Sequence, residues 1–229
     1  MTSLQKWGKS VRTTIPVMAG YLVLGAGFGI LLRTRGYGLG WALAMSAFIY
    51  AGSMQYVAID LLTGGASLLT TAVTTLLVNA RHLFYGISML ERYRAAGRYA
   101  PYLIFSLTDE TYSLVAARED LTGAECFRIS LLDQLYWVLG TALGSLAGAY
   151  LDFNTTGIDF SLTALFLTVF TEQWLETKDH APALIGLGVS IVGRLLFGAD
   201  SFLLPTMGGM LCCLLVLDAR RTKKGGESV

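Results

Sequence analysis

Hydrophobic residues in this chain fall into long blocks that short polar connectors separate. Several blocks approach or exceed the length of about 20 residues that a helix needs to cross a lipid bilayer. Eight apolar segments are expected, at residues 14–33, 40–62, 66–91, 101–117, 128–151, 160–176, 181–198 and 201–217. Because these segments fill most of the chain, the pattern predicts an all-α, polytopic helical membrane protein set in a lipid bilayer.

The composition agrees with this fold and argues against several functions. Of the 229 residues, 54% are hydrophobic and 14% are charged, whereas soluble domains carry about 25% charged residues. The net charge is +1 and no basic stripe with interleaved aromatic residues occurs, so we expect no nucleic-acid partner. The three cysteines lack metal-ligand or redox spacing, and no G-x-x-x-x-G-K-[ST] phosphate loop is present. We therefore expect no metal, no cofactor and no enzyme activity.

We expect one transmembrane domain, 14–217, between a cytoplasmic N-terminus, 1–13, and a basic cytoplasmic tail, 218–229. Lys and Arg occur at both ends, and these residues concentrate on the cytoplasmic side of membrane proteins. Both termini are therefore predicted inside, with an even number of crossings. Strict alternation of eight spans would put the arginines after the third segment outside, against the same rule. A broken or re-entrant helix among the first three segments would remove this conflict.

An internal repeat is predicted to relate residues 14–118 to residues 128–217. YLVLGAGFG from Tyr21 resembles YWVLGTALG from Tyr136, an offset of 136 − 21 = 115. Further matches follow in the same order, with offsets of 173 − 55 = 118 and 194 − 81 = 113. Glycine-rich apolar sequence also aligns by chance, but the nearly constant spacing favours duplication. Many transporters place the solute site between such repeats, which makes Gln173 and Arg194 candidate site residues.

The glycines in the two matching stretches, YLVLGAGFG and YWVLGTALG, are explained by helix packing. Gly25 and Gly29 are four residues apart, as are Gly140, Gly144 and Gly148. Small residues at this spacing allow two membrane helices to approach closely. We therefore expect these glycines to pack helices together and not to bind a ligand.

The stretch TTLLVNARHLFYG, residues 74–86, places three polar side chains in the middle of an apolar segment. Helical spacing puts Asn79 and His82 on one face and Arg81 on another. A charge at the bilayer centre costs about 2.5–3.5 kcal/mol, so Arg81 requires an acidic or carbonyl partner. The alternative is an arginine that reaches the membrane surface. His82 either relays protons, since its charge changes near neutral pH, or bonds a neighbouring helix.

Two other stretches in the first half carry candidate chemistry. In IYAGSMQY, Gly52 and Ser53 weaken an apolar helix and leave backbone groups free for a ligand, while Gln55 adds an amide. Ordinary packing of small residues is the alternative there. In SLTDETYS, Asp109 and Glu110 offer a proton-holding pair or partners for the basic residues. The alternative is a surface helix whose acids face water.

The four stretches YLVLGAGFG, IYAGSMQY, VNARHLFYG and LTDETYS, in this order, resemble the AzlC-type large subunit of branched-chain amino-acid exporters (the LIV-E family). The resemblance has specific motifs over roughly residues 15–120. It implies a secondary exporter of valine, leucine, isoleucine and sometimes methionine in the bacterial inner membrane. It also implies a small membrane partner of the AzlD type. The positions carried over are Gly52, Ser53, Gln55, Asn79, Arg81, His82, Asp109 and Glu110.

Several readings of function stay open at this point. An exporter acting as a proton-coupled antiporter is favoured, because His82 is expected to lie beside Asp109 and Glu110. An aliphatic substrate would need apolar walls, for which Phe48, Tyr50, Phe84 and Tyr85 are candidates. An intramembrane serine protease using Ser53 and His82 is an alternative, although its usual G-x-S-G loop is missing. A passive channel or assembly subunit is a third.

Overall fold

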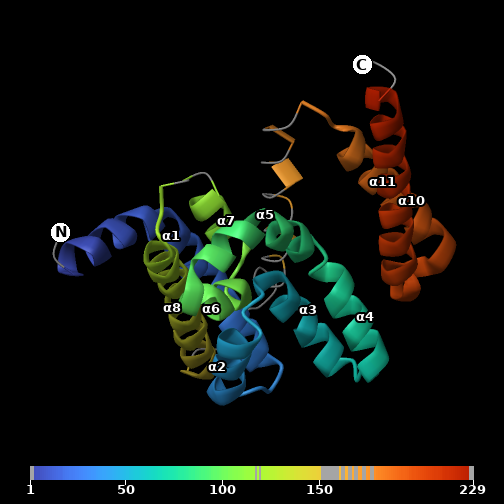
Figure 1. The fold of residues 1–229 in the computed structure, drawn as a ribbon. Helices are drawn as coiled ribbons and strands as arrows, with labels where there is room; N and C mark the ends of the chain where they lie inside the picture. Colours follow the sequence, from blue (N-terminus) through green and yellow to red (C-terminus); the bar gives the residue numbers. More distant parts are fainter. Residues whose placement is uncertain are drawn as a thin grey trace. The chain divides into compact units, whose positions relative to one another are not determined.

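A computed structural model of the chain describes residues 3–116, 118, 120–150, 160, 163–164, 167, 170–171, 174–175 and 178–226. In these ranges all regular secondary structure is helical, as the sequence predicts (Figure 1). The chain divides into two compact units, Met1–Leu162 and Thr163–Val229, which are described separately. The candidate residues of the first half all lie in the first unit.

Two long helices, α1 (Ser3–Thr34) and α8 (Gly123–Tyr150), pack against each other at the centre of the first unit. Their contact runs through the predicted glycines. A Cβ atom added to Gly25 would lie 2.9 Å from the Trp137 carbonyl oxygen, and one added to Gly140 would lie 2.8 Å from that of Leu22. The helices therefore meet backbone to backbone, and the two stretches that match as a repeat are the two that pack together.

Helix α1 begins eleven residues before the apolar segment predicted at residue 14. Polar contacts account for this extension. Arg118 donates a hydrogen bond to Thr13 at 2.9 Å, and Arg128 donates one to Ser10 at 3.4 Å. A Lys9–Glu125 ion pair at 3.8 Å adds a further link to α8. The extra turns thus form through side-chain pairing outside the apolar part of the helix.

The second, third and fourth apolar segments are each broken in two. The first pair is α2 (Leu39–Phe48) and α3 (Gly52–Thr63), and the second is α4 (Leu68–Val78) and α5 (Arg81–Ala95). After a short 3₁₀ turn, η1 (Gly97–Tyr99), the third pair is α6 (Ala100–Phe105) and α7 (Asp109–Ala116). The broken helices expected from the sequence are present, and all three breaks fall in the singled-out stretches.

Two apolar clusters hold the first unit together. In one, the Phe28 ring lies 5.7 Å from Tyr56 and 6.4 Å from Trp137, which joins α1, α3 and α8. The other joins α5, α6, α7 and α8 around Leu103 and Val115, both fully buried. Each broken segment is thereby fixed to the α1–α8 pair on at least one side of its break.

The second unit contains the helices α10 (Ala181–Ser201) and α11 (Leu203–Gly226). They pack closely where a Cβ added to Gly193 would collide with the Thr206 side chain. Gly198 has a φ of 72° and interrupts the regular turns of α10. The predicted segment 160–176 falls mostly outside the described residues.

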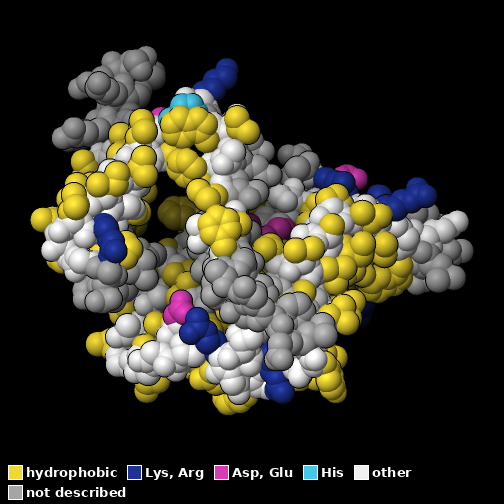
Figure 2. Space-filling view, turned by 180° about the vertical axis from the view of Figure 1, so that it is seen from behind, with side chains coloured by type: hydrophobic (Ala, Val, Ile, Leu, Met, Phe, Trp, Pro, Cys, Tyr) yellow, Lys and Arg dark blue, Asp and Glu magenta, His cyan; other side chains and the backbone are white. Residues whose placement is uncertain are grey.

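Large hydrophobic side chains cover much of the described surface (Figure 2). Leu68 is 90% exposed and Phe48 is 80% exposed, unlike the surface of a soluble protein, where large apolar patches are rare. Two described helices, Gln5–Thr34 and Ala181–Gly198, are long and apolar enough to cross a membrane. The breaks explain why the segments predicted at 40–62 and 66–91 appear only as shorter apolar helices.

Candidate functional site

The breaks in the three helix pairs come together through one arginine. Arg81, the first residue of α5, forms an ion pair with Asp109, the first residue of α7, at 2.7 Å. It also donates a hydrogen bond of 2.8 Å to Ser53, at the start of α3. Arg81 therefore has the acidic partner that its position in an apolar segment requires. Whether Arg81 also reaches the membrane surface, the alternative given above, stays a prediction.

Local sequence explains why the chain leaves the helix at these points. Tyr50 has a φ of 42°, a left-handed conformation that costs a residue with a side chain roughly 1–2 kcal/mol. Gly52 follows, where an added Cβ would lie 3.0 Å from the Trp137 ring. Only a small residue fits there without displacing the indole. The first break is thus held open by packing against α8.

The second acid of the TDET stretch has a different partner. Glu110 accepts a hydrogen bond of 2.7 Å from the hydroxyl of Tyr21 on α1. The same hydroxyl lies 2.8 Å from that of Thr108. Asp109 and Glu110 therefore divide their contacts: Asp109 binds the arginine of α5, whereas Glu110 faces α1. Both acids are partly buried and bonded to other helices, which favours the paired arrangement over a surface helix whose acids face water.

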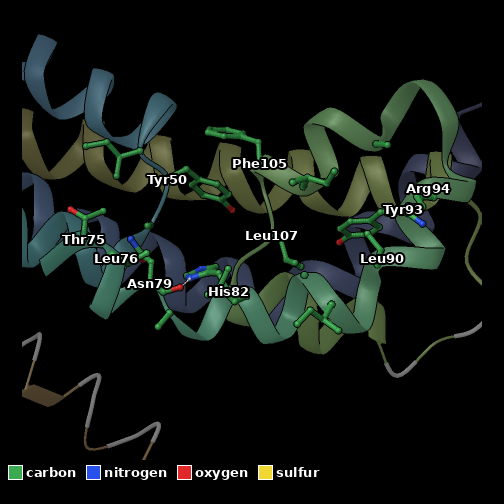
Figure 3. Close-up of a pocket in the computed structure, with 18 residues that line it drawn as sticks. Tyr50, Thr75, Leu76, Asn79, His82, Leu90, Tyr93, Arg94, Phe105 and Leu107 are labelled. Atoms are coloured by element: carbon green, nitrogen blue, oxygen red, sulfur yellow. Dashed lines mark hydrogen bonds between the residues drawn. The ribbon is translucent and has the colours of Figure 1, made fainter. Parts of the chain in front are cut away.

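A cavity of about 740 Å³ lies beside these breaks. Asn79 and His82 line one side of it, and Tyr50 and Phe105 line the other (Figure 3). Most of the remaining wall is aliphatic: Leu76, Leu83, Ile87, Leu90, Ile104 and Leu107. Such a pocket, mainly apolar with a few polar residues such as Asn79 and Arg94 in its lining, is typical of sites for small organic ligands.

Asn79 and His82 share this cavity as helical spacing predicts, while Arg81 points away from it. The carbonyl oxygen of Asn79 lies 3.2 Å from Nδ1 of His82 (Figure 3). The other described contact of His82 is with the Tyr85 ring, 6.0 Å between centroids. His82 is thus not paired with Asp109 or Glu110, the arrangement from which proton coupling was expected. The residues on either side of Arg81 line the cavity, so the ion pair lies directly behind its wall.

The apolar walls differ in part from those expected. Tyr50 lines the cavity. Phe48 and Phe84 do not, being 80% and 68% exposed, and Tyr85 stacks on Tyr112 with 4.6 Å between ring centroids. The breaks turn the helices, so side chains next to the motifs in sequence face outward.

Gln55 lies in a separate buried cluster away from the cavity. Its amide nitrogen donates to Ser46 at 3.2 Å, and its carbonyl oxygen accepts from Trp137 at 2.9 Å. Both ends of the amide are therefore occupied by contacts that join α2, α3 and α8. The Ser53–His82 dyad of the protease alternative is also absent, because the described partner of Ser53 is Arg81.

The two candidates of the second half belong to the second part of the chain, which is described by itself. Gln173 lies outside the described residues. Arg194 belongs to α10 in the second unit, and its guanidinium lies 5.5 Å from the Phe202 ring centroid. Within the described part of the chain, no three His, Cys, Asp or Glu residues gather as metal ligands do.

One buried carboxylate was missed at the level of sequence. Asp133, in the middle of α8, is fully buried and accepts a hydrogen bond of 3.0 Å from Thr111. A lone acid within the apolar segment 128–151 is itself a signal, because ionisable residues inside membrane helices are rare and functional. No recognisable motif surrounds it in the sequence.

The chain matches known proteins over most of its length. A family model described as "AzlC protein" matches residues 16–151. A "Branched-chain amino acid transport protein AzlC" of Bacillus subtilis is 46% identical over 209 residues, covering 89% of this chain and 82% of that protein. An "Uncharacterized membrane protein" of Helicobacter pylori is 42% identical over 207 residues, covering 89% and 91%.

A more distant relative is the "Inner membrane protein YgaZ" of Escherichia coli, 26% identical over 216 residues, which covers 90% of this chain and 87% of that protein. No solved structure matches. The family match spans α1, all three breaks and α8. With relatives named as membrane proteins and the apolar helices described above, the chain is a membrane protein whose regular structure, in the described ranges, is helical. It belongs to the AzlC family.

Proposed function

We propose that this chain is a secondary transporter that exports the branched-chain amino acids valine, leucine and isoleucine, and in addition methionine. The name of the Bacillus subtilis relative supports the substrate class. The convergence of three helix breaks on Arg81, beside an apolar cavity, is the observation that carries the proposal. Interrupted helices at a solute site are a recurring feature of secondary transporters.

The chemistry of the site suits a zwitterion with an aliphatic side chain. Breaking a helix leaves backbone N–H and C=O groups without partners in the same helix. Such groups bind a carboxylate or an ammonium in place of water. The Asn79 side chain adds a polar group to the lining, opposite the Tyr50 ring. The aliphatic wall receives the branched side chain of the substrate. The Arg81–Asp109 ion pair next to this wall holds the helix breaks together.

Coupling, partner and location complete the proposal. Export is driven by protons, with Asp109 and Glu110, the partly buried acids at the third break, as carriers. A small AzlD-type membrane subunit covers the open side of the cavity, where Leu83, Ile87 and Ile104 are more than 60% exposed. The protein is multi-pass in the bacterial inner membrane with both termini cytoplasmic. Residues 14–217 form one transmembrane domain built from two repeats.

The test is leucine transport in everted vesicles that contain both subunits. Arg81→Ala removes the group that joins three helices. A hydrogen bond to a charged group contributes about 1.5–3 kcal/mol, equivalent to about tenfold or more in rate. We expect transport to fall at least that far while the amount of protein in the membrane is maintained. Arg98→Ala is the matched control, because Arg98 is exposed and contacts only Tyr99 among the described side chains.

Two results would contradict the proposal. The first is wild-type protein, with its small subunit, that accumulates none of the branched-chain amino acids. The second is Arg81→Ala that transports leucine at the wild-type rate, which would reduce Arg81 to a structural role.

A further inference from the structure

A continuous chain of hydrogen bonds joins two carboxylates through three hydroxyl groups. Glu110 is bonded to the Tyr21 hydroxyl at 2.7 Å, and that hydroxyl to Thr108 at 2.8 Å. Thr108 is bonded to the Thr111 hydroxyl at 3.2 Å, and Thr111 to Asp133 at 3.0 Å. The members come from α1, α7, α8 and the break before α7. Four short steps thus connect the helix break to the middle of α8.

The chain is shielded from solvent at every position except its outer end. Thr111 and Asp133 are fully buried, and Tyr21 and Thr108 are 4% and 7% exposed. Glu110 is partly exposed, at the start of α7 beside the arginine-bound Asp109. One end of the chain therefore opens at the break, and the other ends on a carboxylate without access to water.

Asp133 has too few partners for a permanent charge. One of its oxygens accepts from Thr111, and the other has no hydrogen-bond partner. The ion pairs of the described residues involve Glu125 and Asp109, not Asp133 or Glu110. Among the described residues, the titratable groups that interact electrostatically with Asp133 are Glu110, Tyr50 and Tyr102, none of them a cation. A buried carboxylate without a cation is stable in its protonated form.

We infer that Glu110, Tyr21, Thr108, Thr111 and Asp133 form a proton relay that stores the coupling proton on Asp133. The inference rests on the proposed function and names its proton pathway. A proton bound by Glu110 passes to the Tyr21 oxygen, the Tyr21 proton to Thr108, the Thr108 proton to Thr111, and the Thr111 proton to Asp133. Each hydroxyl gains one proton and loses one, so one proton moves from Glu110 to Asp133.

The observed bonds are already oriented for this transfer at the inner end. Thr108 donates to Thr111, and Thr111 donates to Asp133. Tyr21 donates to the Glu110 carboxylate. Once Glu110 is protonated and becomes a donor itself, the Tyr21 hydrogen has only to turn towards Thr108. Rotation of the three hydroxyls restores the original polarity after each transfer.

The experiment uses proteoliposomes that contain both subunits and two measurements on each variant. One is exchange of labelled for unlabelled leucine, which needs no net proton movement. The other is leucine accumulation driven by a pH gradient. We expect Tyr21→Phe, Thr111→Val and Asp133→Asn to exchange leucine at a rate within about twofold of wild type. Their accumulation of leucine driven by the pH gradient should fall at least about tenfold, which corresponds to about 1.4 kcal/mol. Thr111→Ser keeps the hydroxyl and is expected to restore driven accumulation.

Tyr56→Phe is the matched control, because Tyr56 is also a buried tyrosine and donates to the Leu24 carbonyl of α1 at 2.7 Å outside the relay. It should retain both activities. Driven accumulation in the relay variants equal to wild type would overturn the inference. The inference would also be overturned if the relay variants lost exchange and driven accumulation equally and Thr111→Ser restored neither. Leucine accumulation driven by a sodium gradient in place of a proton gradient would overturn it as well.

Infrared spectra of the purified protein, titrated with acid, test the relay without transport. We expect a protonated-carboxyl band that is missing in Asp133→Asn, shifted in Thr111→Val and unchanged in Tyr56→Phe. Wild-type protein that exchanges no leucine but shows this band would refute the proposed function and support the proton site. Absence of the band from wild type throughout the titration would refute the relay.

Discussion

Arg81 illustrates how a charged residue is accommodated in an apolar segment. It has two partners on two other helices, at 2.7 and 2.8 Å, and these contacts offset the cost of removing the guanidinium from water. Its ion pair is still partly accessible, with the Arg81 and Asp109 side chains 31% and 27% exposed. The charges are therefore joined to each other and remain near the ligand cavity, as a binding or coupling role requires.

Glu125 provides a pH-dependent prediction outside the apolar part of α8. Its carboxylate accepts from the Thr122 N–H at 2.9 Å and the Thr122 hydroxyl at 2.8 Å, and its own N–H donates to that hydroxyl. This reciprocal capping arrangement satisfies free donors at a helix start. The hydrogen bonds from Thr122 lower the pKa of Glu125 below its usual value of 4.5.

Because the pKa is lower in the folded protein, the charged cap stabilises it above the unfolded-state pKa, and this contribution is lost as pH falls through the folded-state pKa. We expect the melting temperature of wild type in detergent to approach that of Glu125→Gln as the pH drops below 4.5. Glu91→Gln, which changes an exposed carboxylate on α5, serves as the control. A difference between wild type and Glu125→Gln that stays constant with pH would contradict this role.

Single residues differed in how well their contacts were predicted from sequence. The need of Arg81 for an acid followed from the cost of an unpaired charge, and Asp109 is that acid. The roles of Gln55 and His82 did not follow, because an amide or imidazole in an apolar segment has many ways to satisfy its hydrogen bonds. Asp133 was missed because its partner, Thr111, is 22 residues away and only the fold brings them together.

Helix breaks were the most predictable elements of this fold. Gly52 and Ser53, the polar triplet around Arg81, and the TDET acids all oppose a continuous apolar helix, and the chain leaves the helix at each. The position of Phe48 and Phe84 outside the cavity was not predictable, since a break rotates the following turns by an amount that packing decides. Helical spacing thus predicted the shared side of Asn79 and His82, even across a break, but not the outward positions of Phe48 and Phe84.

Close packing of α1 against α8 gives a prediction for Gly144. An added Cβ would collide with the Ala26 carbonyl group of α1, and α1 must then move away. Overpacking of this kind typically costs about 1–3 kcal/mol. We expect Gly144→Ala to lower the melting temperature and the yield of monodisperse protein in detergent.

Gly20→Ala is the control for that substitution, because nothing lies within 4 Å of the added atom. Alanine favours a helix by up to about 1 kcal/mol over glycine, so Gly20→Ala should be as stable as wild type or more so. Equal stability of Gly144→Ala and Gly20→Ala would show that the contact between α1 and α8 is looser than described.

The molecule as a whole follows the predicted class, an all-helical membrane protein of the AzlC family. The apolar blocks and four short motifs were sufficient for that conclusion. The number of crossings, the side of each terminus and the joint role of the two repeats remain predictions. These properties depend on how half-helices pair across the chain, and hydropathy alone does not encode that pairing.

A cysteine-accessibility measurement tests most directly whether the three breaks surround a wet, leucine-binding cavity. Ala51→Cys and Ala80→Cys introduce small thiols into the cavity lining, in protein whose natural Cys126, Cys212 and Cys213 are replaced. Ala72→Cys, exposed on α4 outside the cavity, is the control. We expect a water-soluble thiol reagent to label both cavity positions and leucine to slow that labelling several-fold, with no effect at Ala72→Cys. Cavity positions that stay unlabelled, or that react at the same rate with and without leucine, would contradict the site described here.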